Sequence, residues 1–328
     1  MSKLTFIIPV HNEEGNIGTL LSELERVMGS VTKIDYEILF VDDGSTDQSM
    51  PVIMSYALDN SRISYISLSR NFGKDQALMA GIRYAKYDAA ITLDADLQHP
   101  PQLIPDLIKW WQNGYEVVYA YRKEDNQHTN FINKIRSRLF YKVINALSDI
   151  PLEQGISDYK LIDKKVIKVI SKLPEDKPFL RGIIKWVGFN QKGIEYTPNN
   201  RYSGKTKYSF LKLLMLATDG LTSFSTRPLT FAIYLGFTFS VFSLLYIPYV
   251  LFSLYYHLGR SGWASVIFTT AFFSGLQLMI MGILGLYLGK TFMQTKKRPG
   301  YIIQSSNIPD IENEIDQPGF IHQYQENL

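Results

Sequence analysis

Two aspartates, Asp94 and Asp96, follow a short apolar run in the stretch 87–100, which reads YDAAITLDADLQHP. Carboxylates this close repel each other, so we expect a cation between them. Alternate residues of a strand point to the same side, and at a strand end such a pair can share a hard divalent cation whose shell is completed by phosphate oxygens. Taken alone, Asp-x-Asp is a weak signal, and an aspartate that caps a turn is its commoner explanation; the position after an apolar strand favours the cation site.

A second acidic pair, Asp42 and Asp43, ends the stretch EILFVDDGSTD. A carboxylate at a sheet edge can accept hydrogen bonds from the ring N–H of a base or from a ribose hydroxyl, although Asp and Ser after a strand often only cap the next helix. The chain has neither the G-x-G-x-x-G fingerprint nor a P-loop. A bound nucleotide would therefore be held by another arrangement.

The elements that position these acids alternate between strand and helix. Apolar, β-branched stretches predict strands, and apolar residues at helical spacing predict helices. The predicted strands lie in residues 3–10, 35–47, 63–69, 89–96 and 116–122, and the predicted helices in residues 13–29, 74–86 and 103–114. This order indicates βαβ units and a mostly parallel α/β sheet with flanking helices. Such sheets bind ligands at the carboxyl ends of their strands, where both acidic pairs are expected.

Two long runs without a charged residue lie in the last third of the chain, at 228–256 and 261–289. Each exceeds the ~20 apolar residues that cross a bilayer core, although the mean hydropathy of the chain is only -0.06. We predict two transmembrane helices at about 229–256 and 262–289, joined as a hairpin; two buried core helices are the alternative. Lys and Arg flank both outer ends, which are therefore expected on the cytoplasmic side.

The remaining segments complete the predicted domain organisation. We predict that residues 1–205 form a cytosolic catalytic domain with a basic amphipathic helix near 129–147. Residues 206–227 are predicted to form an interfacial helix, and the alternative for this second helix is that it packs on the sheet or forms a subunit contact. After the membrane helices in 228–290, residues 291–328 form a cytosolic tail that is acidic, extended or partly disordered.

Composition excludes several classes of function. The 34 Lys and Arg against 31 Asp and Glu argue against a nucleic-acid-binding protein, and the absence of cysteine excludes disulfides, thiolate metal sites and a cysteine nucleophile. The apolar run at the start is too short for a signal peptide, so we expect the first part of the chain in the cytosol.

Six motifs occur in a fixed order: FIIPVHNEE, EILFVDDGSTD, SLSRNFGKDQAL, TLDADLQHPP, GISDYKLIDKK and NNRYSGKTKYS. Together they resemble glycosyltransferase family 2, and most closely its polyprenyl-phosphate branch. The resemblance covers roughly residues 3–300 and implies a GT-A-like fold. His11 stands where an aromatic residue is common in the family, and Thr206 where serine is usual, and neither change removes a needed functional group.

The resemblance implies a role for each matching residue. The nucleoside would be surrounded by Pro9, His11, Glu13, Asp42 and Asp43. Mg²⁺ or Mn²⁺ and the diphosphate would be held by Asp94, Ala95 and Asp96. Gln98 would line the sugar pocket. Asp158 corresponds to the acidic residue near the acceptor, and Arg122, Arg201 and Lys207 would contact phosphates. Asp158 could act as a general base or could orient Arg201 or the acceptor.

The expected activity is the transfer of one hexose, with glucose and UDP as the expected sugar and nucleotide, to polyprenyl phosphate at the cytoplasmic face of the plasma (inner) membrane, with inversion. We expect a multi-pass protein with the catalytic domain and both termini in the cytoplasm, and the resemblance suggests a homo-oligomer, specifically a tetramer. A processive polysaccharide synthase is one alternative, but RGIIKWVG lacks the Gln-x-x-Arg-Trp spacing of those enzymes. A membrane scaffold or sensor that binds nucleotide sugar without turnover is the other.

Overall fold

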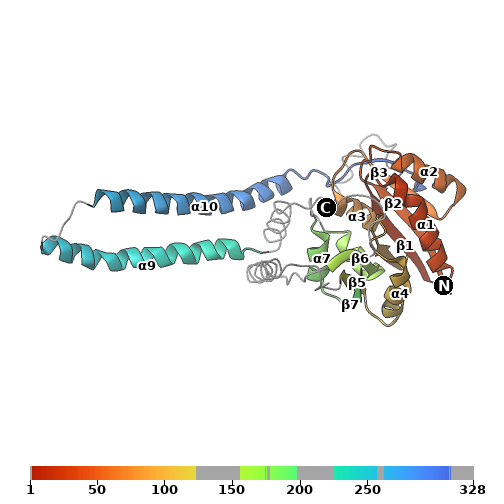
Figure 1. Ribbon diagram of the computed structural model, residues 1–328, viewed down its shortest axis with the longest axis horizontal. Helices are drawn as coiled ribbons and strands as arrows, with labels where there is room; N and C mark the ends of the chain where they lie inside the picture. The colour runs from red at the N-terminus through yellow and green to blue at the C-terminus, as the bar shows by residue number, and fades with distance from the viewer. Residues whose placement is uncertain are drawn as a thin grey trace. The chain divides into compact units, whose positions relative to one another are not determined.

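The computed structural model describes residues 2–122, 156–173, 175, 178–197, 225–256, 262–309 and 311. Strands and helices alternate through the first part of the chain (Figure 1). In chain order they are β1 (Ser2–Val10), α1 (Glu14–Met28), β2 (Ile34–Asp42), α2 (Ser49–Asp59), β3 (Ile63–Leu68), α3 (Lys74–Tyr84), β4 (Ala89–Thr92), the 3-10 turn η1 (Pro101–Leu103), α4 (Ile104–Gln112), β5 (Val117–Arg122), β6 (Ile156–Asp163), α6 (Lys164–Ile170), α7 (Leu180–Trp186), β7 (Gln191–Tyr196), α9 (Arg227–Tyr255), α10 (Trp263–Thr295) and β8 (Ile303–Ser306).

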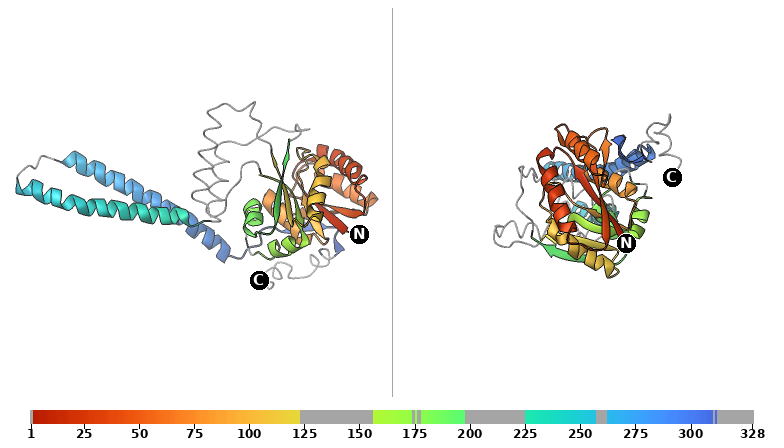
Figure 2. Two further views of the ribbon diagram at one scale, coloured as in Figure 1. Left: turned by 90° about the horizontal axis from the view of Figure 1, so that it is seen from below. Right: turned by 90° about the vertical axis from the view of Figure 1, so that its right-hand side faces the viewer.

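One sheet of eight strands joins the strands of the described residues in the order β7-β5-β6-β4-β1-β2-β3-β8. Figure 2 gives two further views of these strands and helices. Strand β1 runs parallel to β2 and β4, β2 runs parallel to β3, and β5 runs parallel to β7. Only β6 and β8 run antiparallel to their neighbours. The predicted α/β fold with a mostly parallel sheet and flanking helices is confirmed.

Helices cover both faces of this sheet because its central strands are apolar on both sides. Leu4, Phe6 and Ile8 of β1 belong to a buried cluster with residues of α1 and α4. The alternate residue Ile7 faces α3, where a Cβ on Gly81 would come within 2.2 Å of its side chain. Glycine at that position therefore lets α3 lie close against β1 and β2, and the start of α3 is fixed relative to the strand ends.

The five predicted strand stretches correspond to β1 to β5, while β6, β7 and β8 were not predicted from the sequence. Strand β4 ends at Thr92, so Asp94 and Asp96 lie in the following loop and strand alternation does not set their directions. Helix α2 is also an addition to the predicted elements.

Strand β8 brings the segment after α10 to the edge of the sheet, beside β3. The Asn307 side chain accepts a hydrogen bond from the Tyr65 N–H at 2.7 Å and donates one to the Ile63 carbonyl at 3.2 Å. The Ser306 hydroxyl donates to the Tyr65 carbonyl at 2.8 Å. Within the predicted tail of residues 291–328, the first five residues still belong to α10 and residues 303–306 form a hydrogen-bonded strand.

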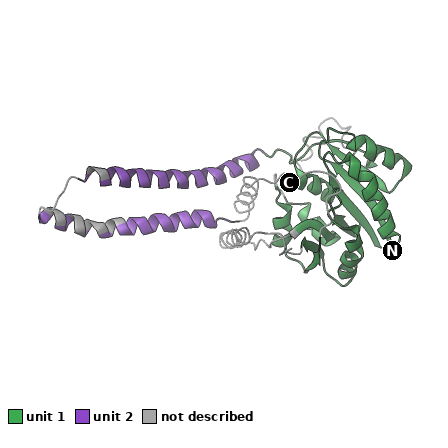
Figure 3. Ribbon diagram, viewed as in Figure 1, with its two compact units in different colours: residues 1–138, 152–210, 297–328 green, residues 139–151, 211–296 purple. Residues whose placement is uncertain are grey.

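The chain divides into two compact units, one of residues 1–138, 152–210 and 297–328 and one of residues 139–151 and 211–296 (Figure 3). In the second unit, α9 runs continuously through Pro248, and Phe239 of α9 contacts Phe272 and Phe273 of α10. Within α10, Ser265–Thr295 is long and apolar enough to cross a membrane; Arg227–Phe242 of α9 is a shorter apolar segment by the same criteria. The predicted interfacial helix near 129–147 and residues 206–224 of the second one lie outside the described residues.

Candidate active site

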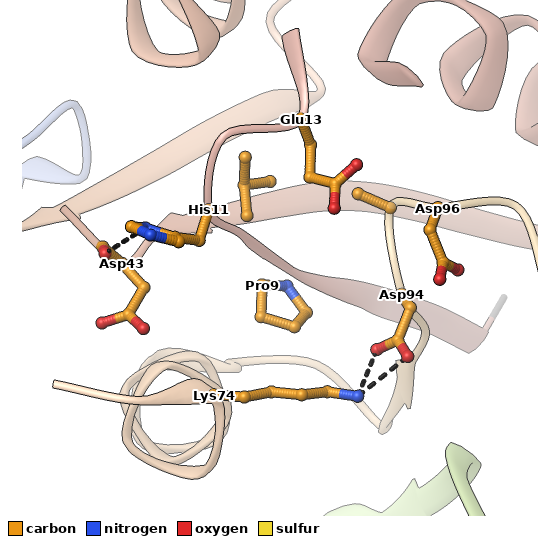
Figure 4. Close-up of a pocket in the computed structure, with 9 residues that line it drawn as sticks. Pro9, His11, Glu13, Asp43, Lys74, Asp94 and Asp96 are labelled. Carbon is orange, nitrogen blue, oxygen red and sulfur yellow. Dashed lines mark hydrogen bonds and ion pairs between the residues drawn. The ribbon is translucent and has the colours of Figure 1, made fainter. Parts of the chain in front are cut away.

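A pocket of about 210 Å³ lies at the carboxyl ends of β1, β2 and β4, next to the start of α3 (Figure 4). It is lined by Pro9, Val10, His11, Glu13, Asp43, Lys74, Asp94, Ala95 and Asp96. Seven of the residues singled out by the sequence are therefore brought together from three separate motifs. Val10 and Lys74 were not among them.

Asp43 is fixed by the loop that begins α3. Its carboxylate accepts hydrogen bonds from the backbone N–H of Phe72 at 2.7 Å and of Gly73 at 3.0 Å. Burial raises the pKa of Asp43, and these two hydrogen bonds oppose the rise. Gly44 makes the contact possible, because it has φ +63 and a Cβ there would lie 2.4 Å from the Arg70 backbone.

Asp94 points toward Lys74 in the pocket (Figure 4). The Lys74 ammonium lies 2.6 Å from Oδ1 and 2.8 Å from Oδ2 of Asp94. Burial acts to raise the pKa of Asp94, but the ammonium outweighs it and the pKa lies below its ordinary value. A lysine of the same chain thus supplies a positive charge beside Asp94.

The same ammonium reaches Asp158 of β6, whose Oδ2 lies 2.8 Å away. Arg181 of α7 binds Asp158 through two parallel hydrogen bonds, Nε to Oδ1 at 2.7 Å and Nη2 to Oδ2 at 2.8 Å. Burial would raise the pKa of Asp158, yet Lys74 and Arg181 hold it well below its ordinary range. Asp158 is therefore a firmly ionised carboxylate with both oxygens engaged.

Lys74 stands at the first position of α3, where the helix dipole disfavours a cation. Burial further opposes its charge, but Asp94 and Asp158 outweigh burial and raise its pKa. A lysine held against both effects indicates that the position of its charge matters to the site.

Two further buried groups lie beneath the pocket. His99 accepts a hydrogen bond at Nδ1 from the Asp94 N–H at 3.0 Å and stacks on Tyr159. Burial lowers its pKa, so the ring is neutral with its proton on Nε2. Lys160 of β6 is 1% exposed, and burial lowers its pKa to about 8 against the attraction of Asp158.

Asp42, Gln98 and Arg122 are not among the residues that line the pocket. Asp42 is buried and accepts hydrogen bonds from the Ser45 N–H at 3.2 Å and from the Ser67 hydroxyl at 3.1 Å, so it braces the loop after β2. Arg122, at the end of β5, donates to the side-chain oxygen of Gln98 at 3.5 Å. Arg201 and Lys207 lie outside the described residues.

Sequence reasoning missed Lys74 and Arg181. Lys74 had a usable signal, since it lies in the motif SLSRNFGKDQAL just after a predicted strand. Arg181 had none, because it sits in a short apolar helix more than twenty positions from Asp158 and meets it only through the fold.

The donor set of the pocket fits a hard divalent cation, since Glu13, Asp94 and Asp96 offer carboxylate oxygens to one cavity. Across the described residues, no group of three or more His, Cys, Asp or Glu side chains is arranged to hold a metal by itself. Mg²⁺ commonly binds through one or two carboxylates and completes its shell with substrate phosphates and water. Asp94 and Asp96 are the residues that would hold it here.

This arrangement can do a specific kind of chemistry. Carboxylates of the kind that bind a hard cation line the pocket together with Lys74, and Arg181 binds Asp158 next to that lysine. Such a site can bind a diphosphate and stabilise the negative charge that develops when it departs.

Comparisons with known proteins give one matching family model and several relatives of similar length. The sequence model described as "Glycosyl transferase family 2" matches residues 5–171. The chain is 41% identical over 303 residues to "Uncharacterized glycosyltransferase YkcC" of Bacillus subtilis, covering 92% of this chain and 93% of that one. It is 35% identical to "Prophage bactoprenol glucosyl transferase homolog" of Escherichia coli, covering 92% and 98%. A solved structure, mannosyl-3-phosphoglycerate synthase of Rubrobacter xylanophilus, is similar with a TM-score of 0.46 at 15% identity, covering 68% of this chain and 73% of that one.

Proposed function

This chain belongs to glycosyl transferase family 2 and is a glycosyltransferase, and on that premise we propose that it moves a single hexose from a nucleotide sugar to polyprenyl phosphate. Glucose is the proposed sugar and UDP the proposed nucleotide. The reaction takes place at the cytoplasmic face of the plasma membrane and inverts the anomeric configuration.

The observation that carries this proposal is the joining of Asp94 and Asp158 by Lys74. Asp94 lies where the diphosphate of the donor is expected, and Asp158 corresponds to the acidic residue near the acceptor. One ammonium within 2.8 Å of both carboxylates means that donor and acceptor groups would meet within a few ångströms of each other. Direct transfer in one step needs such proximity.

The acceptor proposal rests on two further observations. Relatives of nearly full length carry the name bactoprenol glucosyl transferase, at 34–35% identity. The long apolar helix α10 is suited to keep the chain at a membrane, where a lipid phosphate would be met. We assign the capture of its head group to Arg201 and Lys207, since guanidinium binds phosphate in bidentate fashion and ammonium acts as a point charge.

The acceptor needs little help to become nucleophilic. A phosphate monoester has its second pKa near ~6, so its oxygen is largely anionic at neutral pH. That oxygen attacks the anomeric carbon from the side opposite the diphosphate, the bond from this carbon to the diphosphate oxygen breaks, and the electron pair leaves with the nucleoside diphosphate. A divalent cation bound at Asp94 and Asp96 would supply Lewis-acid stabilisation of that leaving group.

Asp158 then acts as a positioning group. Its carboxylate accepts three charge-assisted hydrogen bonds and its pKa is held well below the ordinary range, so it is a poor proton acceptor at neutral pH. We expect Asp158→Asn to keep substantial activity and Asp158→Ala to lose it, because the amide preserves part of the hydrogen bonding. Comparing kcat of both variants tests this; equal, near-complete loss in both would point to a proton-transfer role.

The decisive assay incubates the purified full chain with Mg²⁺, undecaprenyl phosphate and a panel of nucleotide sugars. The expected result is one nucleoside diphosphate released per hexose that enters the lipid fraction, and none with EDTA. Release without lipid product, or no release at all, would contradict the proposal, the latter being the behaviour of a sensor. Products with more than one hexose would instead indicate a processive synthase.

The proposal includes a homo-oligomer, with a tetramer as the expected state, and a hairpin of α9 and α10 with both termini in the cytoplasm. Native mass spectrometry in detergent tests the first part. Protease accessibility of terminal tags in inverted vesicles tests the second.

A further inference from the structure

Lys74 is placed where a metal ion would compete with it. Its ammonium contacts both oxygens of Asp94, and the side chain is 40% exposed while lining the pocket. An ammonium in that position engages the same lone pairs that a divalent cation would use.

The two cations cannot share Asp94 without cost. A divalent ion that coordinates a carboxylate oxygen at ~2 Å would lie within a few ångströms of the ammonium, and like charges at this distance repel strongly in a partly buried site. The shared carboxylate is also 26% exposed, so solvent screens the repulsion only in part.

The carboxylates that line the pocket do not complete a coordination shell by themselves. No cluster of three ligating side chains exists among the described residues, so a shell for the ion has to be completed by other oxygens. A nucleoside diphosphate brings those oxygens, and it also brings negative charge to which a displaced ammonium can move.

We propose that Lys74 and the divalent ion compete for Asp94, and that the diphosphate of the donor resolves the competition by accepting Lys74. The metal then binds tightly only together with the nucleotide. This inference rests on the proposed function for its metal and its donor, and it adds a role for Lys74 in coupling their binding. Asp158 retains Arg181 when Lys74 moves, so the acceptor side of the site keeps one of its two cationic partners.

The test measures Mn²⁺ binding by electron paramagnetic resonance, with the purified full chain in detergent and no lipid acceptor. For the native chain, saturating UDP is expected to tighten Mn²⁺ binding by at least about tenfold, as the relief of one charge repulsion implies. Mn²⁺ binding that is independent of UDP would overturn the inference, and this measurement needs no variant.

Two substitutions then separate charge from structure. Lys74→Gln removes the charge and is expected to tighten Mn²⁺ binding without UDP by about tenfold, with a correspondingly smaller effect of UDP. Lys74→Arg keeps the charge and is expected to leave binding weak, and Lys109→Gln, on the exposed side of α4, is the matched control. Unchanged or weaker Mn²⁺ binding in a folded Lys74→Gln variant would refute the competition.

These readouts are independent of turnover. Cooperative binding of Mn²⁺ and UDP without transfer to lipid would refute the proposed function but not the coupling through Lys74. Transfer to lipid with independent binding of Mn²⁺ and UDP would refute the coupling but not the proposed function.

Discussion

Replacing Arg181 by methionine should measure how much its ion pair with Asp158 contributes to the free energy of unfolding. The change keeps most of the apolar bulk and removes both hydrogen bonds to a carboxylate that is 5% exposed. Removing one partner of a buried ion pair costs about 3–5 kcal/mol. The Arg181 side chain is 39% exposed and Lys74 remains on the carboxylate, so screening and the second partner reduce our expectation to about 2 kcal/mol.

The assay is thermal unfolding of the purified chain at pH 7, followed by tryptophan fluorescence. For a domain of this size, about 2 kcal/mol corresponds to a midpoint lower by about 4–8 °C. Adding Asp158→Asn to Arg181→Met should recover part of the loss, because it removes a buried charge that has kept Lys74 but lost Arg181. Arg26→Met is the control, since its ion pair with Glu23 lies at the surface and its removal should leave the midpoint unchanged.

The pH dependence gives the same reasoning a second test. The pKa of Asp158 is lower in the folded than in the unfolded chain, so its stabilising contribution is complete above the ordinary aspartate value of 3.8 and fades as the pH falls below it. The penalty of Arg181→Met should therefore persist from pH 7 down to about pH 4. A penalty no larger than that of Arg26→Met, or one that vanishes well above pH 4, would refute the argument.

Three other changes test separate features. Gly44→Ala should lower the unfolding free energy by at least about 2 kcal/mol and raise the KM for the nucleotide sugar, because Gly44 has a positive φ and a Cβ there would clash with the Arg70 backbone. Gly15→Ala is the control, since its Cβ would meet nothing within 4 Å, and equal thermal unfolding midpoints for the two variants would contradict the expectation. Burial lowers the pKa of Lys160 in the folded chain from 10.5 to about 8, so the unfolding free energy should rise by roughly 3 kcal/mol as the pH goes from 8 to 10.5. Lys160→Met should flatten this rise, and an unfolding free energy of the native chain that does not change over this pH range would contradict the expectation. Asn307→Ala should speed amide hydrogen exchange at Tyr65, whose N–H donates to the Asn307 side chain, and unchanged protection there would argue against that bond.

The sequence predicted the part of the fold that is local. Strands β1 to β5 are apolar runs separated by turn residues, and the aspartates that follow β2 and β4 indicate the edge of the sheet where the pocket lies. The order of the motifs predicted that Asp43, Asp94 and Asp96 lie near one another, because parallel strands bring their carboxyl ends together, and all three line the pocket.

What the sequence could not predict depends on contacts between distant segments. Strand β6 carries the motif GISDYKLIDKK but was not predicted as a strand, and only its antiparallel pairing with β4 and β5 places Asp158 beside Lys74. The direction of Asp94 depends on the loop after β4 and on the lysine that it meets, so strand alternation was the wrong guide there. The basic residues Arg201 and Lys207 stay predictions.

The pairing of β8 with β3 has a consequence for biosynthesis. Translation proceeds from the amino terminus, so the ribosome completes β3 long before β8 and must first produce both α9 and α10. Until then the nascent sheet carries an open edge, which is a known template for unwanted pairing. The edge of β3 is therefore covered by β8 only after both apolar helices have been synthesised.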